Sequence, residues 1–248
     1  MISFLVFITA IIAGIGYFVL GQGLWVIVAL LVVTLATRFR EQTKSYGRFV
    51  EVVFLFCLVS FVIGQLGIHF PYSLIIVLAS LIMLISLDGP AWGELYFLPA
   101  LTHKYFKLSL VVAFLTLAVF GIWVFLKVPA GENPVPLSWP LDTLIVMGVG
   151  FAFYLAIVEE IIFRSILLER VKSAAGINWA VPIQGTFYGL MHYRSGIPNG
   201  LGGVALVSCF GIGLGYLVKK SNSVYLSMLV NFVVTFLVFL ELTVLGKA

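Results

Sequence analysis

The sequence predicts an all-α membrane protein, a polytopic bundle of eight or nine transmembrane helices. Hydrophobic residues make up 62% of the 248 residues and charged residues 10%, far from the roughly 45–50% apolar and 25% charged residues of soluble domains. The apolar residues gather into runs of about 15 to 25, close to the length that spans a bilayer. These two observations exclude a soluble globular protein and favour one compact membrane domain.

Nine apolar segments are candidates for membrane-spanning helices. They cover residues 2–20, 24–37, 49–68, 71–87, 108–127, 142–165, 178–193, 200–218 and 223–245. The second is short and the seventh contains Pro182, Gly185 and Gly189, so either could be tilted, re-entrant or partial. Residues 2–20 lack a basic segment before them and another apolar run follows closely, so we expect this segment to be retained.

Lysine and arginine are distributed unequally between the connections. If all nine segments cross and the N-terminus is cytoplasmic, the inner connections 38–48, 88–107, 166–177 and 219–222 hold most of the basic residues. Only Lys127, Arg194 and Lys247 fall on the other side. This positive-inside pattern predicts a cytoplasmic N-terminus. It also accounts for the net charge of +4, so no nucleic acid partner is expected.

A proline-rich connection divides the chain. Residues 128–141 hold four prolines and a glycine, which predicts a turn-rich outer loop without helix. Residues 1–127 before it carry few ionisable groups inside helices, whereas residues 142–248 contain nearly all the intramembrane polar positions. Earlier in the chain, residues 88–107 mix aromatic and basic side chains, so we expect a connection at the membrane surface that includes His103.

Residues 158–164 place three ionisable side chains in an apolar helix. A charged residue near the bilayer centre costs roughly 2.5–3.5 kcal/mol, so adjacent carboxylates need a partner or a water-filled cavity. Glu160 and Arg164 are four residues apart, in the acid-before-base order that pairs best. Glu159 lies about 100° away around the helix and lacks this partner. We therefore expect a Glu160–Arg164 ion pair and a Glu159 carboxylate that is free for proton chemistry.

Three further polar positions lie in the second half of the chain. His192 closes the seventh apolar segment and Asn231 lies in the ninth. Ser227 precedes Asn231 by four residues, so the hydroxyl and the carboxamide share a helical face. Alone, each residue is explained by packing or by interhelical hydrogen bonds. Beside the glutamate pair we favour a functional role for His192, and Asn231 stays open between the two interpretations.

The order of these residues resembles a known family. A Glu-Glu-x-x-x-Arg element precedes Phe-x-x-x-x-His, then a glycine-rich helix with Gly211-x-x-x-Gly215, then a helix with Asn231. This pattern, within residues 142–235, is similar to the CAAX protease and bacteriocin-processing family of intramembrane glutamic endopeptidases. The resemblance implies a hydrolase in a bacterial inner membrane. Its substrate would be a membrane-associated protein or peptide, cleaved near its C-terminus or membrane anchor.

The resemblance also implies roles for individual residues. Glu159 and His192 would activate water. Glu160 and Arg164 would form a supporting ion pair, and Asn231 would contribute to the oxyanion site. Residues 142–248 would then form the catalytic helical core, with residues 1–127 as additional helices of the same membrane domain.

Ser227 is a departure from the family pattern. The family has a His-x-x-x-Asn pair in its last motif, and Ser227 occupies the histidine position. Loss of one oxyanion donor costs on the order of 2.7–4 kcal/mol in a characterised protease. A serine hydroxyl can still donate, so we include Ser227 among the expected catalytic residues.

No metal or other cofactor is expected. A zinc site needs about three suitable ligands, whereas His69, His103 and His192 are widely separated and no His-Glu-x-x-His pattern occurs. Cys57 and Cys209 lie inside apolar segments and are expected to be small buried hydrophobes.

The chemistry favours a glutamate base. Peptide hydrolysis needs a base near neutral pH, and a low-dielectric cavity raises the pKa of a glutamate toward that range. Glu159 is the natural candidate. A serine–histidine dyad with Ser227 or Ser195 lacks a nucleophile-elbow sequence and would leave the glutamate pair unexplained.

The proposed pairing of Glu159 with His192 sets a geometric condition. If the sixth helix ended at Arg164, His192 would lie roughly 21 Å deeper in the membrane than the end of that helix. We therefore predict a sixth helix that continues to about Val171, and a seventh that is tilted or distorted near Gly185 and Gly189.

Two other function classes remain open. Glu159, Glu160 and His192 could form a proton or cation relay in a transporter or channel, because intramembrane carboxylates also mark such pathways. Paired broken helices in two related halves would favour that alternative. A catalytically silent scaffold or immunity-type protein on the same fold is the second alternative, motivated by Ser227.

Overall fold

The computed structural model describes residues 2–21, 23–38, 43–68, 71–87, 95–97, 103–127, 140–194 and 196–245, and this part of the chain forms helices and turns without a β-strand. The predicted all-α fold is confirmed. Each of the nine predicted apolar segments corresponds to a helix within these ranges. Several predicted features lie outside the described residues: His69, Ser195, the proline-rich loop up to residue 139 and most of the connection before His103.

The helices follow one another with short connections. They are α1 (Ile2–Ile15) with the π-helix η1 (Gly16–Leu20), α2 (Gly23–Arg38), α3 (Lys44–Gln65), α4 (Tyr72–Leu87), α5 (His103–Lys127), α6 (Leu141–Glu160) with the π-helix η4 (Ile161–Leu167) and α7 (Leu168–Ala175), α8 (Ile177–Leu190), α9 (Gly200–Ser221) and α10 (Tyr225–Leu245).

Five helical runs in the described part of the chain are long and apolar enough to cross a membrane. They are Lys44–Gln65, Tyr105–Leu126, Leu141–Ala175, Gly200–Ser221 and Tyr225–Thr243. The chain is accordingly an integral membrane protein. By contrast α8 has 14 residues and is only about 21 Å long, less than the roughly 30 Å of the hydrocarbon core. The seventh predicted segment is therefore a partial span.

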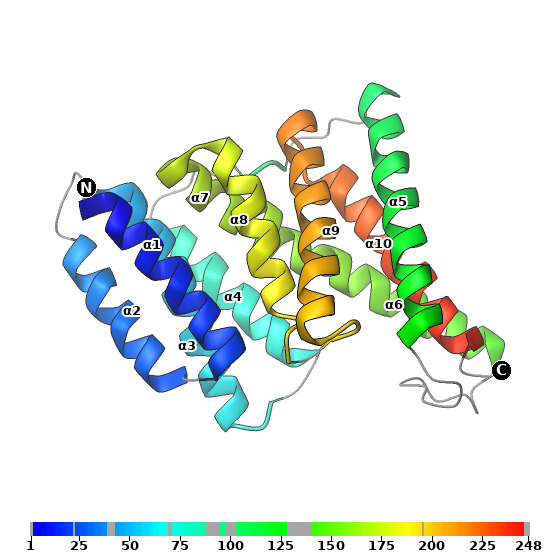
Figure 1. The fold of residues 1–248 in the computed structure, drawn as a ribbon, viewed down its shortest axis with the longest axis horizontal. Helices are drawn as coiled ribbons and strands as arrows, with labels where there is room; N and C mark the ends of the chain where they lie inside the picture. Colours follow the sequence, from blue (N-terminus) through cyan, green and yellow to red (C-terminus); the bar gives the residue numbers. More distant parts are fainter. Residues whose placement is uncertain are drawn as a thin grey trace.

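The helices are arranged around a central pair (Figure 1). Helices α1 to α4 lie on one side of the molecule and α5, α6 and α10 on the other, with α8 and α9 between them. Helix α8 packs along α9 and against α7, and α10 packs against α6 and α5. Residues far apart in sequence are thereby brought to the middle of the bundle.

The sixth helix is long, as predicted. Helix α6 continues through η4 into α7, so the run from Leu141 to Ala175 spans 35 residues. Glu159 lies about 27 Å from its first residue and about 24 Å from its last, close to the middle. The run ends at Gly176, whose φ of +81° favours glycine and whose N–H donates to Lys172 O at 2.8 Å.

The glycines of α8 serve close packing. A Cβ at Gly185 would lie 2.7 Å from Ile212 N, and one at Gly189 would lie 2.8 Å from Ser208 N. The predicted distortion at these glycines is wrong, because α8 is a continuous α-helix through both. The irregular turn lies instead in η4, directly after the glutamate pair.

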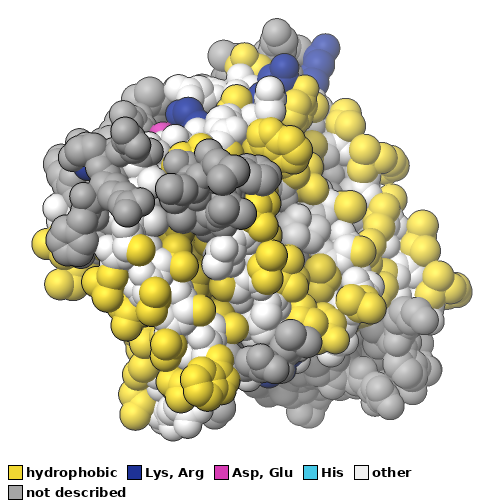
Figure 2. Space-filling model, turned by 60° about the vertical axis from the view of Figure 1, so that its left-hand side comes forward, with side chains coloured by type: hydrophobic (Ala, Val, Ile, Leu, Met, Phe, Trp, Pro, Cys, Tyr) yellow, Lys and Arg dark blue, Asp and Glu magenta, His cyan; other side chains and the backbone are white. Residues whose placement is uncertain are grey.

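The outer surface is apolar over most of the visible face, and most visible Lys and Arg side chains gather at one end (Figure 2). The α7–α8 and α9–α10 connections and the N-terminus also lie at one end of the molecule (Figure 1). Large apolar side chains are left exposed, including Phe114 at 71% and Phe125 at 77% on α5. Contact with lipid tails explains such exposure, since in lipid it carries no hydrophobic cost.

The two cysteines differ in their surroundings. Cys57 on α3 is buried, as predicted, and Cys209 on α9 is exposed. The prediction for Cys209 is wrong because a membrane helix can turn an apolar residue toward lipid as readily as toward the protein interior.

Candidate functional site

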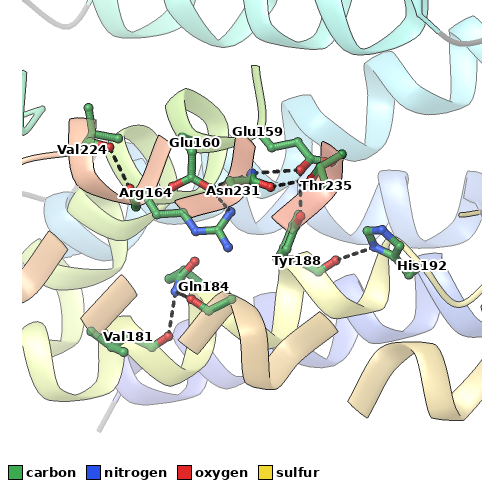
Figure 3. A network of polar contacts seen from close by, with 12 residues as sticks. Glu159, Glu160, Arg164, Val181, Gln184, Tyr188, His192, Val224, Asn231 and Thr235 are labelled. Carbon is green, nitrogen blue, oxygen red and sulfur yellow. Dashed lines mark hydrogen bonds and ion pairs between the residues drawn. The ribbon is translucent and has the colours of Figure 1, made fainter. Parts of the chain in front are cut away.

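Polar side chains from three helical runs meet inside the bundle (Figure 3). Glu159 and Glu160 come from the end of α6, Arg164 from η4, Tyr188 from α8 and Asn231 from α10. Glu160, Arg164 and Asn231 are fully buried, and Glu159 is 5% exposed. Buried groups of this kind require mutual partners.

Glu160 and Arg164 are in ion-pair contact. Arg164 Nη1 lies 3.0 Å from Glu160 Oε1, and neither side chain is exposed. The two residues are four apart, so the helical backbone itself fixes their approach. The guanidinium also lies over the ring of Tyr188, with Cζ 4.2 Å from the ring centroid. Arg164 therefore contacts both the carboxylate on its own helix and the aromatic face presented by α8.

Asn231 bridges the two glutamates. Its Nδ2 donates to Glu160 Oε1 at 3.0 Å and to Glu159 Oε2 at 3.3 Å. Thr235, one turn further along α10, donates from Oγ1 to Asn231 Oδ1 at 3.0 Å. This bond orients the carboxamide with its nitrogen toward the acids. Both amide hydrogens of Asn231 are consequently engaged.

Glu159 receives a second hydrogen bond from the aromatic residue on α8. The Tyr188 hydroxyl donates to Glu159 Oε2 at 2.7 Å. Its other oxygen, Oε1, has no partner among the described residues. The carboxylate is thus held on one oxygen and open on the other.

His192 follows the end of α8. Its Nδ1 lies 3.2 Å from Tyr188 O, and because a carbonyl only accepts, Nδ1 carries the hydrogen. In the neutral ring Nε2 is then an acceptor. Gly196, with a φ of +110°, packs against the ring, where a Cβ would lie 2.6 Å from His192 Cδ2. The loop after α8 therefore fixes both the tautomer and the ring position.

Glu159, Tyr188 and His192 line one cavity of about 1150 Å³. Its remaining lining is mainly apolar and comes from both halves of the chain, including Phe56, Phe120, Phe151 and Phe210. No hydrogen bond joins Glu159 to His192 among the described residues, so the cavity leaves space for a small molecule between a carboxylate oxygen and a ring nitrogen. Such a pair can handle protons beside an apolar ligand.

The structure separates Ser227 from this cavity. Ser227 is fully buried, and its hydroxyl donates to Val224 O at 2.8 Å. Neither Ser227 nor Asn231 lines the cavity. Asn231 reaches it only through its contact with Glu159. The expected common cavity is therefore seen for Glu159 and His192, and Ser227 lies behind the acid pair.

Two members of the site were missed from the sequence, Tyr188 and Thr235. Tyr188 precedes His192 by four residues and Thr235 follows Asn231 by four. That spacing was the available signal, because residues four apart share a helical face. The packing of α8 on α9 places Tyr188, since a Cβ at Gly211 would lie 3.0 Å from its Cδ1.

Gln184 lies one turn before Tyr188 and was also missed. Its Nε2 donates to Gly211 O at 2.7 Å, and its Oε1 has no partner within the described structure. The same holds for Arg164 Nε and Nη2. In the described ranges, no group of three or more His, Cys, Asp or Glu side chains gathers in a way that could hold a metal ion.

Comparison with known proteins identifies the second half of the chain. Residues 140–237 match the family model described as type II CAAX prenyl endopeptidase Rce1-like. The match includes the acid pair, Arg164, Tyr188, His192 and Asn231, and it confirms the resemblance inferred from the motifs. Neither the curated proteins nor the solved structures give a match.

Proposed function

We propose, from the Rce1-like match of residues 140–237, that this membrane protein is a CAAX-type intramembrane glutamic endopeptidase. It would hydrolyse a peptide bond near the C-terminus or membrane anchor of a membrane-associated protein or peptide. The observation that carries the proposal is the placement of Glu159 and His192 on one cavity, with Glu159 held by Tyr188 and Asn231.

Glu159 is the general base in this proposal. Its Oε2 accepts two hydrogen bonds, which leaves Oε1 to bind a water molecule. His192 Nε2 accepts the second hydrogen of the same water, because Nδ1 is committed to Tyr188 O. A water held between two acceptors presents an oxygen lone pair to a substrate carbonyl.

The bond changes then balance. Glu159 takes one proton as the water oxygen bonds to the carbonyl carbon, and the carbonyl π electrons move to its oxygen. The C–N bond breaks when the proton on Glu159 passes to the leaving nitrogen and the carbonyl re-forms. The products are a carboxylic acid and an amine, and no metal or redox partner is needed.

Glu160 and Arg164 support the base without reacting. A buried carboxylate fixed by a guanidinium keeps a charge close to Glu159 and holds Asn231 in place. Asn231 in turn separates the two carboxylates by donating to both. We propose that Asn231 contributes to the oxyanion site by turning one amide hydrogen toward substrate, while Ser227 has a smaller part.

The cavity suits a substrate with a long apolar portion. Its volume of about 1150 Å³ and its phenylalanine-rich lining favour a lipid-modified or strongly apolar segment over a polar peptide. The printed family description names a prenyl endopeptidase, so a prenylated C-terminal motif is the first substrate to test. The remaining partner is the lipid bilayer.

The orientation follows from charge. Lys172, Lys219 and Lys220 belong to the α7–α8 and α9–α10 connections, at the same end as the N-terminus (Figure 1). We propose that this end faces the cytoplasm of a bacterial cell, with the protein in the inner membrane.

A catalytically silent relative is the second candidate. It is favoured by Ser227, whose hydroxyl is committed to Val224 O and does not reach the cavity. Such a protein would bind the apolar segment of a partner without cleaving it.

One experiment separates the two candidates. Purified wild type and Glu159→Gln in liposomes are given an internally quenched peptide with a farnesylated C-terminal CAAX motif, and in parallel the same peptide without the farnesyl group. Glu159-dependent cleavage of either peptide supports the endopeptidase. Equal signals from wild type and variant, with both proteins folded, contradict it.

A further inference from the structure

The site lacks a committed donor for the oxyanion. The Ser227 hydroxyl donates to Val224 O at 2.8 Å. The two amide hydrogens of Asn231 point at Glu159 and Glu160. Amide hydrolysis places negative charge on the carbonyl oxygen, and a preorganised donor near that oxygen is usually the largest single contribution to catalysis.

Tyr188 has the required position. It lines the cavity between Glu159 and His192, and its hydroxyl is the hydrogen-bond donor nearest to the proposed base, at 2.7 Å from Glu159 Oε2. The guanidinium of Arg164 lies over its ring, with Cζ 4.2 Å from the centroid. A cation on the ring face withdraws electron density and strengthens the hydroxyl as a donor.

We infer that Tyr188 is a catalytic residue whose hydroxyl stabilises the oxyanion, an inference that rests on the proposed endopeptidase function. In the resting site the hydroxyl donates to the ionised Glu159. When Glu159 takes the proton from water, it becomes a weaker acceptor. The hydroxyl then turns to the oxygen that has gained the electron pair from the carbonyl, and it donates a hydrogen bond without transferring its proton.

The same hydrogen bond thus changes partner as the charge moves. Before the reaction the negative charge lies on Glu159, and after attack it lies on the substrate oxygen. A donor that follows the charge stabilises the transition state more than the ground state. On release of the leaving amine, Glu159 returns to the carboxylate form and recovers the Tyr188 bond.

The surrounding helices hold this aromatic side chain in place. Gly211 on α9 leaves room for the ring, since a Cβ there would lie 3.0 Å from Tyr188 Cδ1. The ring of Phe163 on η4 packs against it at 5.0 Å between centroids. Its backbone carbonyl meanwhile accepts from His192 Nδ1. One residue therefore links the base, the histidine and the cation.

Tyr188→Phe tests the inference, because it removes the hydroxyl and keeps the ring. Tyr96→Phe is the matched control, since Tyr96 also donates to a glutamate, Glu169 Oε2, at 3.0 Å, and does not line the cavity. We expect Tyr188→Phe to lower kcat by about 10²–10³-fold with KM within about threefold of wild type. Tyr96→Phe should leave both constants unchanged.

A second readout distinguishes stabilisation of the oxyanion from simple positioning of Glu159. A phosphinic analogue of the farnesylated peptide carries a tetrahedral anionic centre, and its binding requires no proton transfer. The inference predicts that Tyr188→Phe weakens this analogue by a factor similar to the loss in kcat, while the uncleaved peptide bound to Glu159→Gln and to the double variant has one affinity.

The outcomes are separable. If wild type cleaves a probe, Glu159→Gln does not, and Tyr188→Phe retains more than about a third of wild-type kcat with undiminished affinity for the phosphinic analogue, the endopeptidase stands and the role of Tyr188 is overturned. If kcat falls but analogue affinity is unchanged, Tyr188 only positions Glu159, and the inference also fails. If folded wild type shows no Glu159-dependent cleavage of either probe, the proposed function and the inference fail together.

Discussion

Tyr188 on α8 donates a hydrogen bond to Glu159 on α6 across 2.7 Å, although 29 residues separate them in the sequence. This contact places the end of a 14-residue helix at the middle of a 35-residue one. The short helix does not need to cross the membrane to bring His192 to the acid pair. Depth in the bilayer is supplied by the long helix, and proximity by the packing of α8 on α9.

The Glu160–Arg164 pair is predicted to stabilise the fold. Arg164→Ala strands a buried carboxylate, so the free energy of unfolding in detergent should fall by about 3–5 kcal/mol, and activity with it. Lys172→Ala is the control, because the Lys172 side chain in its pair with Glu169 is 39% exposed and its loss should cost less than about 1 kcal/mol. Unchanged stability of Arg164→Ala would assign the guanidinium to the substrate site instead.

The roles of the two polar residues on α10 are predicted to differ. Asn231→Ala leaves the carboxylates of Glu159 and Glu160 without the amide between them, so hydrolysis should fall by about 10²-fold or more. Ser227→Ala removes a hydroxyl that serves Val224 O, so we expect no more than about a tenfold loss. Initial rates with the farnesylated peptide measure both. Equal losses would mean that Ser227 acts at the reacting centre.

Thr235 is predicted to act through Asn231. Thr235→Val keeps the shape of the side chain and removes the bond to Asn231 Oδ1, worth about 0.5–1.5 kcal/mol, so kcat should fall by roughly 2–10-fold. The control is Thr186→Val, an exposed position where the hydroxyl bonds only Pro182 O. A Thr235 variant with the kcat of wild type would show that the carboxamide orients without this bond.

Close packing of α8 on α9 is predicted to be necessary for the site. Gly185→Ala places a Cβ 2.7 Å from Ile212 N, a backbone atom that cannot move freely, so stability should fall by about 1–3 kcal/mol. At Gly202, earlier on α9, a Cβ meets nothing within 4 Å. Gly202→Ala should therefore be neutral or stabilising by up to about 1 kcal/mol. Thermal unfolding in detergent compares the pair, and equal effects would contradict the packing argument.

The membrane helices and the acid pair follow from local features of the sequence. Apolar runs predict the helices because lipid imposes length and composition on each one separately. The Glu160–Arg164 contact needs only helical spacing, and the long sixth helix follows from the requirement that Glu159 and His192 lie at similar depth. These predictions depend on one helix, or on one distance along it.

The rest depends on contacts between helices, which a single apolar sequence specifies poorly. Tyr188 in an apolar segment has the pattern of a core residue, and nothing local shows that its hydroxyl meets Glu159. Gly185 and Gly189 predict distortion or close approach equally well, and only the partner helix α9 decides for the second. The exposure of Cys209 likewise depends on which face of α9 meets lipid.

The most direct test of the central claim compares the two adjacent glutamates. In single-turnover hydrolysis of the farnesylated peptide, Glu159→Gln should give no product, because the amide keeps the Tyr188 bond but cannot take a proton from water. Its unfolding temperature should match wild type. Glu160→Gln leaves Arg164 without its carboxylate and should lower the unfolding temperature as well as the rate. Glu159→Gln with more than a few per cent of the wild-type rate would contradict the assignment of Glu159 as the base.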